Sequence, residues 1–493
     1  MVGAPGGLRA GEVAVAVPGG LCLTAANSVA AEALRARGLE GPAPGPRTAG
    51  KPRGDPDDAD IVRDEAGGGD SGSPRLAREA LVLALMAELA RGEASPWLPY
   101  LRALPGHGDA GLDQPGAGGP LAHLRGPAAT GRGGLHCLCL WTPEQLELLK
   151  GTDALRELER PASDDTELPN MTNEHWEYVA RPFFEGHPEL GVPVDDEGRQ
   201  LHRLATALVA SYSFSLYDAE RQAMVPFWDM LNHAPPGRKH VRLNNAVPPG
   251  GHEREAGELQ MIATEDVPQG GELLNSYGAL SNSELLRRYG FVLPDNRHDC
   301  VYLRVRGARL ARLAQRVMFP TPRTLEQARR RLKSMRLRLG VLRRANLLQN
   351  GRAKSVFRVS RSGRPSAALL ETLRVLSMPD REFYEMLFFL RTNTPPMPGP
   401  PSPRQEAFFE IVLKWLARER LEPLIGEYEP STSAATRPKG AGGAHSEHRG
   451  ALAIAVVRGE AECLEALRRR AGRPFPPLEP QVVHRTWRGF WAP

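Results

Sequence analysis

Apolar residues recur with a helical period over several long stretches of the chain. Between Leu76 and Arg91, three leucines stand four residues apart, at Leu81, Leu85 and Leu89. Residues at this spacing share one face of a helix, so the stretch predicts a helix that buries that face. The same period predicts amphipathic helices over Leu201–Ala210, Ala367–Leu390 and Gln405–Leu421.

Shorter apolar runs bounded by turn residues predict strands. Val13–Val17 is expected to be a buried strand, and a second apolar run, Leu21–Thr24, follows it. His136–Trp141 also reads as a strand. It leads into a helix with Thr142 as N-cap and Pro143 as its first residue, a position where the missing N–H of proline costs nothing.

Glycine and proline are concentrated in a few tracts, while the overall composition is that of a globular protein. The tracts at 38–75 and 105–132 lack periodicity, so we expect disordered insertions there. Pro430–Gly450 is expected to be a linker, and Ala451–Arg470 a final helix without an assigned role. With 493 residues, the chain should contain two or more domains.

Charge and cysteine content narrow the class of protein. The net charge of +5 suits an acidic protein partner or weak nucleic-acid contact without establishing either. The five cysteines are scattered and odd in number, which favours a reducing compartment over a disulfide framework. The sequence has neither a long apolar run nor a signal-peptide pattern, so we expect a soluble protein in the nucleus, the cytoplasm or both. We also expect a monomer.

One segment, 323–344, is strongly basic, with nine basic residues and a single acidic one, Glu326. A solvated helix face is one interpretation, and a dock for an acidic substrate or a nuclear signal is the other. Nucleic-acid binding through this segment is a third and weaker hypothesis.

Side chains that could form a site are concentrated between Met224 and Phe291. An apolar strand there ends in Asp229, Asn232 and His233, which places a carboxylate, an amide and an imidazole where a strand meets a loop. No second histidine or cysteine stands at ligand spacing from His233, so no metal is expected.

A second segment completes this candidate site. It is expected to contain a strand at Glu272–Asn275, a turn at Tyr277, and a helix that begins at Ser281 or Asn282. The helix should bring Tyr289 close to Tyr277. By themselves, these residues predict a pocket with polar and aromatic walls.

In this order, the two segments resemble the C-terminal half of a SET domain, of the non-histone branch typified by the Rubisco large-subunit lysine methyltransferase. The resemblance implies an α+β fold, with a pseudoknotted, β-rich SET domain, an inserted helical subdomain and an all-α substrate-binding lobe. It also implies domain boundaries: the SET domain over 1–306 with its helical insert at about 143–216, the lobe over 307–425, and a linker and C-terminal helix of unknown role over 426–493.

The same resemblance assigns roles to individual residues. Tyr277 would be the catalytic tyrosine, whose hydroxyl aligns the acceptor amine with the methyl group. Phe214 and Tyr289 would face the target lysine of a protein substrate. The residues assigned to the S-adenosylmethionine site are Asn232, His233 through its backbone, Asp229, Tyr212 and Tyr289.

The Ser211–Phe214 segment narrows the resemblance further. Rubisco-type enzymes carry Ser-Arg-x-Phe at this position, and Tyr212 here replaces the arginine. The Tyr-Ser-Phe sequence is similar to that of the sub-branch that methylates an NF-κB subunit, within a group that also includes ribosomal-protein lysine methyltransferases. We therefore expect a lysine acceptor on a non-histone protein.

Two features leave alternative functions open. Val13–Val17 and Leu21–Thr24 look like the first β-hairpin of this branch, but only Gly6-Gly7 stands where the family has a Gly-x-Gly turn that contacts the cofactor. A catalytically weak or inactive binding module is therefore one alternative. Trp228-Asp229-Met230 also resembles a protein-histidine methyltransferase, which makes histidine the alternative acceptor.

Overall fold

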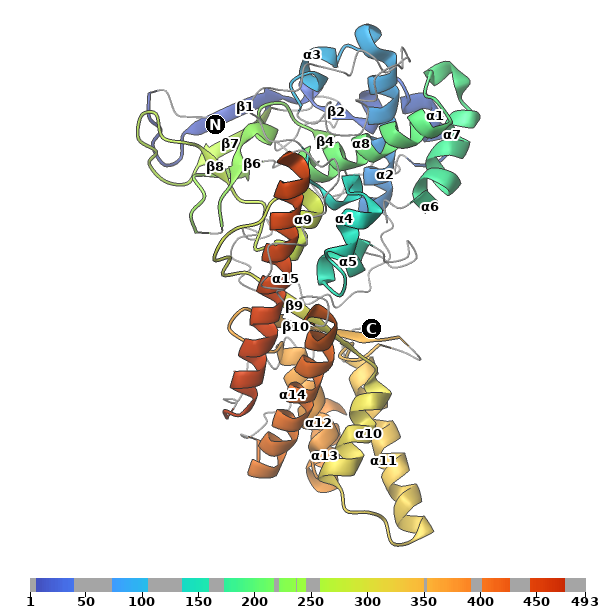
Figure 1. Cartoon of the computed structure of the whole chain (residues 1–493), viewed down its shortest axis with the longest axis vertical. Coiled ribbons are helices and arrows are strands. Elements are labelled where there is room, and N and C mark those ends of the chain that lie inside the picture. Colours follow the sequence, from blue (N-terminus) through green and yellow to red (C-terminus); the bar gives the residue numbers. More distant parts are fainter. Residues whose placement is uncertain are drawn as a thin grey trace.

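The chain folds into an α+β structure whose two halves follow one another along the longest axis (Figure 1). This computed structural model describes residues 6–39, 73–104, 135–158, 173–216, 221–235, 237–244, 258–349, 353–391, 401–425 and 444–474. The predicted insertions and most of the predicted linker lie outside these residues. Of the predicted insertion at 38–75, residues 38–39 and 73–75 are described, and a helix begins at Ser73. Among the described residues, no helix is both long and apolar enough to cross a membrane.

One small sheet joins the beginning of the chain to its middle. β1 (Val13–Pro18) pairs antiparallel with β7 (Glu258–Ala263), which also pairs with β6 (Val241–Asn244). β1 was expected to be buried, but the side chain of Val13 is 45% exposed and only Val17 is enclosed, at 2%. As an edge strand of an antiparallel sheet, β1 keeps one face open to solvent.

The predicted first hairpin does not form. β2 (Leu23–Thr24) pairs with β4 (Arg221–Met224) instead of β1, and β3 (Ser213–Leu216) pairs with the other edge of β4. Between β1 and β2 the chain makes a 3₁₀ turn at Gly19–Leu21. The two N-terminal strands therefore belong to different sheets, and each takes its partner from a distant segment.

A long helix forms the core of the upper half. In α2 (Ser73–Arg91), the predicted face of Leu81, Leu85 and Leu89 is at most 1% exposed and packs against α8 (Asp196–Tyr212). Both helices are confirmed. The shorter helices around them are α1 (Ala31–Ala36), α3 (Leu98–Leu101), α4 (Pro143–Glu147), α5 (Asp153–Leu158), α6 (Asn173–His175), α7 (Arg181–Glu185) and α9 (Asn282–Tyr289).

The segment His136–Trp141 is not a strand. It forms a 3₁₀ helix at Leu138–Leu140 that packs against α8 and α9, and among the described residues it has no partner strand. The close approach requires Gly290, whose φ is +77° and where a Cβ would come within 2.6 Å of the His136 backbone. The predicted cap of α4 by Thr142 is present as a capping box.

The lower half is a helical lobe attached through a two-stranded sheet. β9 (Cys300–Val305) pairs antiparallel with β10 (Ser355–Ser360), a strand that the sequence pattern did not predict. The stretch expected as one helix over Ala367–Leu390 is two helices, because Pro379 lies between them and cannot donate a backbone hydrogen bond. The lobe helices are α10 (Gly307–Met318), α11 (Leu325–Arg344), α12 (Ala367–Ser377), α13 (Asp380–Arg391) and α14 (Pro403–Ile425).

The final helix, α15 (Ala444–Ala471), begins within the predicted linker and spans both halves (Figure 1). It packs against α14 of the lobe and against α9 and β9. Leu452 and Val456 are buried in a core with residues of the upper half, whereas Leu464 and Leu467 are buried in the core of the lobe. The helix that had no assigned role therefore connects the two cores.

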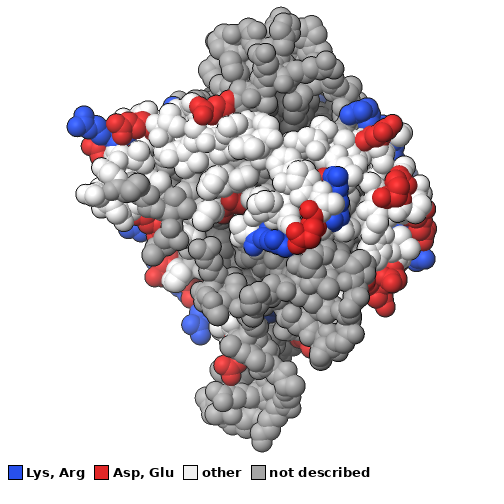
Figure 2. Space-filling model, turned by 90° about the horizontal axis from the view of Figure 1, so that it is seen from above, with Lys and Arg blue, Asp and Glu red and all other residues white. Residues whose placement is uncertain are grey.

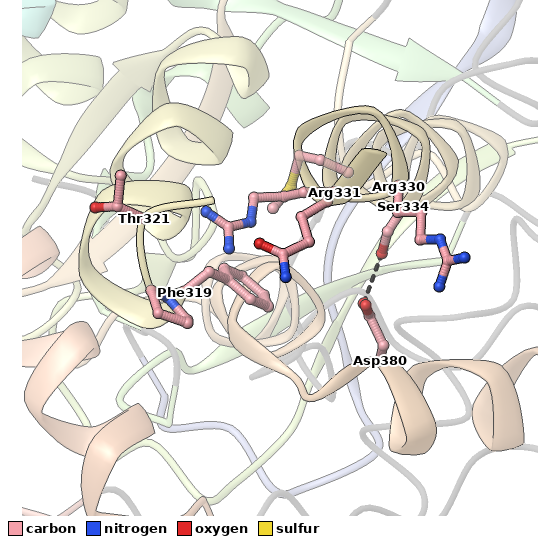
Figure 3. Close-up of a pocket in the computed structure, with 9 residues that line it drawn as sticks. Phe319, Thr321, Arg330, Arg331, Ser334 and Asp380 are labelled. Carbon is pink, nitrogen blue, oxygen red and sulfur yellow. Dashed lines mark hydrogen bonds between the residues drawn. The ribbon is translucent and has the colours of Figure 1, made fainter. Parts of the chain in front are cut away.

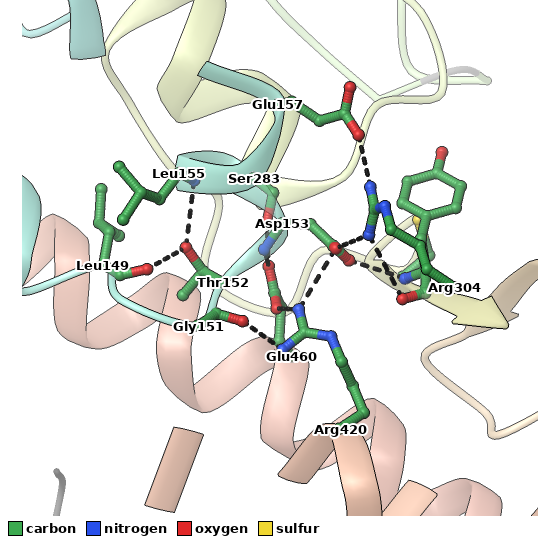
Figure 4. Close-up of polar contacts among 12 residues, drawn as sticks. Leu149, Gly151, Thr152, Asp153, Leu155, Glu157, Ser283, Arg304, Arg420 and Glu460 are labelled. Atoms are coloured by element: carbon green, nitrogen blue, oxygen red, sulfur yellow. Dashed lines mark hydrogen bonds and ion pairs between the residues drawn. The ribbon is translucent and has the colours of Figure 1, made fainter. Parts of the chain in front are cut away.

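A buried polar network lies where the two halves meet (Figure 4). The Glu460 carboxylate on α15 accepts hydrogen bonds from the Asp153 backbone N–H at 2.6 Å and from the Ser283 hydroxyl at 2.7 Å. Arg420 of α14 forms ion pairs with Glu460, at 2.6 Å, and with the Asp153 side chain, at 3.3 Å. Asp153 also pairs with Arg304 of β9. All of Glu460, Asp153 and Arg420 are buried.

Removal of Glu460 should strongly destabilise the protein. Glu460→Ala removes the nearer of the two carboxylates that pair with the buried Arg420 and leaves the Asp153 N–H and the Ser283 hydroxyl without their acceptor, and breaking a buried pair in this way typically costs about 3–5 kcal/mol of unfolding free energy. Chemical denaturation would measure the loss. Glu465→Ala, which breaks the exposed pair with Arg468, is the control and should cost less than about 1 kcal/mol. Equal losses for the two variants would show that the network does not stabilise the fold.

Candidate active site

The site is built around a short parallel pair of strands. β5 (Asn232–His233) pairs with β8 (Leu274–Asn275), with Asn232 opposite Leu274 and His233 opposite Asn275. The hydrogen bond from Ala234 N–H to the Asn275 carbonyl, 2.7 Å, extends the contact. The two segments that the sequence singled out are thus adjacent in the fold.

Tyr277 is fixed at both ends by groups from the first segment. Its backbone N–H donates to Nδ1 of His233 at 3.0 Å, and its hydroxyl donates to the Leu231 carbonyl at 2.7 Å. Gly278 follows with φ +111°, a conformation that only glycine adopts readily. The ring therefore has one orientation, with its hydroxyl directed at the end of the first segment.

Aromatic rings surround Tyr277. The ring of Tyr289, from α9, lies 4.6 Å from that of Tyr277 between centroids, and the ring of His233 lies 5.0 Å away. Phe291 closes the cluster at 6.3 Å. The predicted proximity of Tyr277 and Tyr289 is confirmed, and α9 has the predicted N-cap at Ser281, with a capping box to Glu284. Phe291 was not predicted as a site residue, because the only signal in the sequence was its position directly after Tyr289-Gly290.

Burial favours the uncharged forms of the ionisable groups here. It lowers the pKa of His233 to about 4, with a smaller effect from His298, so the imidazole is neutral and can accept from the Tyr277 N–H. Burial also raises the pKa of Tyr277 above its usual value, and the neighbouring Tyr289, Tyr212 and Asp229 raise it further. The phenol is therefore protonated at neutral pH.

Asp229 has a partner that the sequence did not suggest. Its carboxylate accepts a hydrogen bond of 2.7 Å from the hydroxyl of Tyr100, a residue of α3. Burial raises the pKa of Asp229 to about 6, although the hydrogen bond from Tyr100 acts in the opposite direction. Tyr100 stands 129 residues before Asp229 and belongs to no motif, so the sequence held no signal for it.

Two other predicted residues lie at the junction of α8 and β3. Tyr212 is the last residue of α8, and burial raises its pKa, with smaller effects from Cys137 and Asp229. Phe214 packs edge-to-face against the buried Trp228, 5.5 Å between ring centroids, at the border of the upper core. It presents a flat apolar surface.

Asn232 lies at the exposed edge of the site. Its side-chain amide donates to the Glu272 carboxylate at 2.7 Å, a contact between two residues of the paired segments. Phe227, which directly precedes the 3₁₀ turn at Trp228–Met230, has φ +70° and is 63% exposed. A bulky residue in this conformation costs of order 1–3 kcal/mol, and such strain is concentrated at functional sites.

Seen from above, the surface of the upper half shows charges of both signs, interspersed with broad uncharged areas (Figure 2). A group of three or more histidine, cysteine and acidic side chains that could hold a metal ion is not found within the described residues. The described residues of the site supply aromatic rings, hydrogen-bonding groups and ionisable side chains.

Comparison with solved structures identifies the fold. The SET domain of LSMT bound to lysine and AdoHcy matches with a TM-score of 0.55 and 14% identity, over 95% of this chain and 83% of that chain. Rubisco LSMT bound to AdoMet matches with a TM-score of 0.53 and 15% identity, over the same shares of the two chains. The class is thus set: the chain has the fold of a SET domain with a helical lobe, and the predicted fold class is confirmed.

Within this class, the sequence is similar to N-lysine methyltransferase SETD6. The protein of Rattus norvegicus is 31% identical over 244 residues, which are 47% of this chain and 42% of the relative, and that of Homo sapiens is 30% identical over the same shares. The chain thus spans less than half the length of these curated relatives. No protein-family model matches it. The predicted resemblance to the LSMT-like branch of SET proteins is confirmed.

The depressed pKa of His233 should make stability depend on pH. Between about 6.5, its unfolded value, and about 4, its folded value, the unfolded chain binds the proton and the folded chain does not. Stability is therefore complete above pH 6.5 and falls as the pH decreases to 4. In His233→Asn, whose side-chain oxygen can accept from Tyr277 N–H, denaturation midpoints should change less across this window. An unchanged pH dependence in His233→Asn would show that the lowered pKa of His233 does not cause the loss of stability.

Proposed function

We propose that the chain transfers a methyl group from S-adenosylmethionine to a lysine side chain of a non-histone protein. The observation that carries the proposal is the position of Tyr277 within a SET fold. Its hydroxyl donates to the Leu231 carbonyl. Its ring is surrounded by those of Tyr289, His233 and Phe291. Support comes from the names of the relatives, which are N-lysine methyltransferases, and from the solved neighbours bound to AdoMet or to lysine.

The residues of the site fit this cofactor. Bound S-adenosylmethionine supplies an electrophilic methyl group on a cationic sulfonium. The aromatic faces of Tyr277 and Tyr289 attract such a cation, and the Asp229 carboxylate adds hydrogen-bonding capacity. Asn232 and the backbone of His233 would hold the polar end of the cofactor, and Tyr212 would border it. The contact between Asn232 and Glu272 is at the surface, so exchanging it for a ligand contact costs little.

The acceptor amine must be neutral to attack. A lysine with a pKa of about 10.4 is mostly protonated at neutral pH, and transfer from water into a low-dielectric channel favours its uncharged form. The same burial keeps His233 and Tyr277 uncharged. Asp229, whose pKa is raised to about 6, remains mostly ionised at neutral pH, but its carboxylate accepts a hydrogen bond from the Tyr100 hydroxyl.

Tyr277 can orient the amine without exchanging a proton. Its O–H donates a hydrogen bond to the Leu231 carbonyl. The lone pairs of the phenol oxygen therefore remain available to accept a hydrogen bond from an N–H of the amine. That contact would turn the nitrogen lone pair toward the methyl group. In-line geometry of this kind contributes to the transition state because the reacting atoms must be aligned to within a fraction of an ångström.

We infer an intracellular setting from the cysteines. All five are unpaired, and burial raises the pKa of Cys22, Cys137 and Cys300 to between about 11 and 12, so these thiols are unreactive at neutral pH. Such a set suits a reducing compartment. The nucleus, the cytoplasm or both are proposed.

Incubation of the chain with a lysate and methyl-labelled cofactor should yield labelled lysine. Phe214 supplies an apolar wall suited to an alkyl chain, whereas an imidazole would need a polar group to orient it. Amino-acid analysis of the labelled proteins distinguishes the acceptors. Label on histidine alone would overturn the choice of acceptor. An absence of label together with cofactor binding by calorimetry would indicate a non-catalytic binding module.

Tyr277→Phe should reduce methylation about 100-fold or more while leaving cofactor affinity nearly unchanged, because the hydroxyl positions the amine and misplacement by about 1 Å has this effect on rate. The phenyl ring preserves the aromatic cluster. Turnover and calorimetric titration of the same preparation measure the two effects. Asn232→Ala is the contrasting variant, with weaker cofactor binding as its first defect. Parental turnover in Tyr277→Phe would exclude this tyrosine from the mechanism.

A further inference from the structure

The carboxylate of Asp229 is held by uncharged hydrogen-bond donors. The hydroxyl of Tyr100 donates to it at 2.7 Å from α3, which lies 129 residues earlier in the sequence. Backbone hydrogen bonds from Phe227 and from Asp229 itself also favour its ionised form. Among the described residues, no cationic side chain contributes to the pKa of this carboxylate. Asp229 is therefore an oriented anion without a counter-ion in the part of the chain that the structure describes.

Asp380 in the lobe is a contrasting carboxylate. It lines a pocket of about 260 Å³ between α11 and the start of α13, where it accepts a hydrogen bond of 2.7 Å from the Ser334 hydroxyl (Figure 3). Arg338 pairs with it at 2.7 Å. Partial burial raises the pKa of Asp380, but the contacts with Ser334 and Arg338 outweigh it and lower the pKa below its usual value. Neutral donors have no such effect at Asp229, where burial raises the pKa to about 6.

The backbone just before Asp229 is strained at Phe227. This residue has φ +70°, and its side chain is 63% exposed, so packing of the ring does not explain the conformation. Its backbone is one of the donors to Asp229. Bulky residues persist in the left-handed region only where their surroundings require it, and they are concentrated at functional sites. The strained turn and the Tyr100 hydroxyl thus fix the orientation of one carboxylate from two sides.

The charge of Asp229 reaches the centre of the candidate site. Burial raises the pKa of Tyr277 and of Tyr212, and the charge of Asp229 raises both further. Asp229 also stands two residues before Leu231, whose carbonyl accepts the hydrogen bond from the Tyr277 hydroxyl. An anion in this position attracts a cation that binds among these rings, and partial burial strengthens the attraction.

We propose that Tyr100 is a positioning residue, which holds the Asp229 carboxylate as the counter-ion of an onium cation bound in the site. The cation is the sulfonium of S-adenosylmethionine or the ammonium of the acceptor lysine, which share a positive charge on an alkylated atom. The identity of these ligands rests on the proposed function. In the structural alternative, the contact only ties α3 to the segment before β5, and the charge of a ligand has no effect.

Between pH 5 and pH 8, Asp229 is the group of this cluster that changes its charge. The titratable groups around it are Tyr100 of α3, Tyr212 of α8, Tyr277 and Cys22. Burial raises the pKa of all three tyrosines above the usual value and that of Cys22 to about 11, so these groups stay neutral. Burial lowers the pKa of His233 to about 4, below this range. The preference for a cation should therefore increase as the pH rises through about 6, where Asp229 loses its proton.

Calorimetric titration of the full chain tests the sulfonium without methyl transfer. S-adenosylmethionine and S-adenosylhomocysteine differ by one methyl group and its positive charge. From pH 5 to pH 8, the ratio of their affinities should shift toward S-adenosylmethionine by about tenfold. In Tyr100→Phe, the midpoint of this shift should lie at least about one pH unit higher, because loss of a hydrogen bond to the charged form raises the pKa of Asp229.

Two variants serve as controls for this titration. Asp229→Asn removes the charge and should leave only the pH dependence of the ligands themselves. Tyr178→Phe removes the hydroxyl of a tyrosine of the same half that is 78% exposed, and it should behave like the parent. Tyr100→Phe keeps the ring that packs in the upper core, so it should remain folded, and its denaturation midpoint at pH 8 checks this.

A second pair of ligands distinguishes the two cations. Free lysine and norleucine, titrated into the chain saturated with S-adenosylhomocysteine, differ by the terminal amine. A pH-dependent affinity ratio in this pair alone would assign the counter-ion to the acceptor, and one in the first pair alone would assign it to the cofactor. Either result supports the proposal if Tyr100→Phe moves the midpoint.

The remaining outcomes overturn the proposal. If neither ratio depends on pH, Asp229 is not a counter-ion. If the midpoints of Tyr100→Phe and the parent agree, Tyr100 has only a structural role. In both cases the parent still binds the cofactor, so the proposed function is unaffected. If the parent binds neither S-adenosyl compound, the proposed function fails and this inference fails with it.

Discussion

The buried carboxylate of Glu460 links three parts of the chain that are far apart in sequence. It is bound by Arg420 of α14, by the backbone N–H of Asp153 in α5, and by the hydroxyl of Ser283 at the start of α9. Charges inside a protein are tolerated only when each has its partner in good geometry. The network therefore allows one relative position of the two halves, and burial raises the pKa of Glu460 as the cost of this arrangement.

The geometry of the site depends on the same contacts. Ser283 lies in the first turn of α9, the helix that carries Tyr289, and the turn at Tyr277 directly precedes this helix. The neighbouring Asn282 donates its backbone N–H to the buried Asp299 at 3.0 Å. The first turn of α9 is thus fixed on both the α15 and β9 sides. The distance between the rings of Tyr277 and Tyr289 follows from a helix position that is set at the junction of the two halves.

The two ends of the molecule use charge in opposite ways. At the site, burial raises the pKa of Asp229 and Tyr277 and lowers that of His233, so each group moves toward its uncharged form. A neutral amine is favoured by the same environment. On α11, by contrast, most of the cations are exposed to solvent, and Arg338 is the buried exception. The candidate site is thus desolvated, whereas most charges of α11 remain hydrated.

The sequence by itself determined the elements whose signals are local. The helical period at Leu81, Leu85 and Leu89, the cap of α9 at Ser281 and the cap of α4 at Thr142 depend on neighbours within a few residues, and all are present. The order of Asn232-His233 and Tyr277 was sufficient to indicate the SET fold.

Tertiary structure decided what depends on distant partners. Neither the pairing of β1 and β2 with separate strands nor the contact of Tyr100 with Asp229 could be read from spacing, because strand pairing and hydrogen bonding between segments leave no local pattern. The role of α15 was hidden for the same reason: its two buried faces are complementary to two cores that exist only after folding.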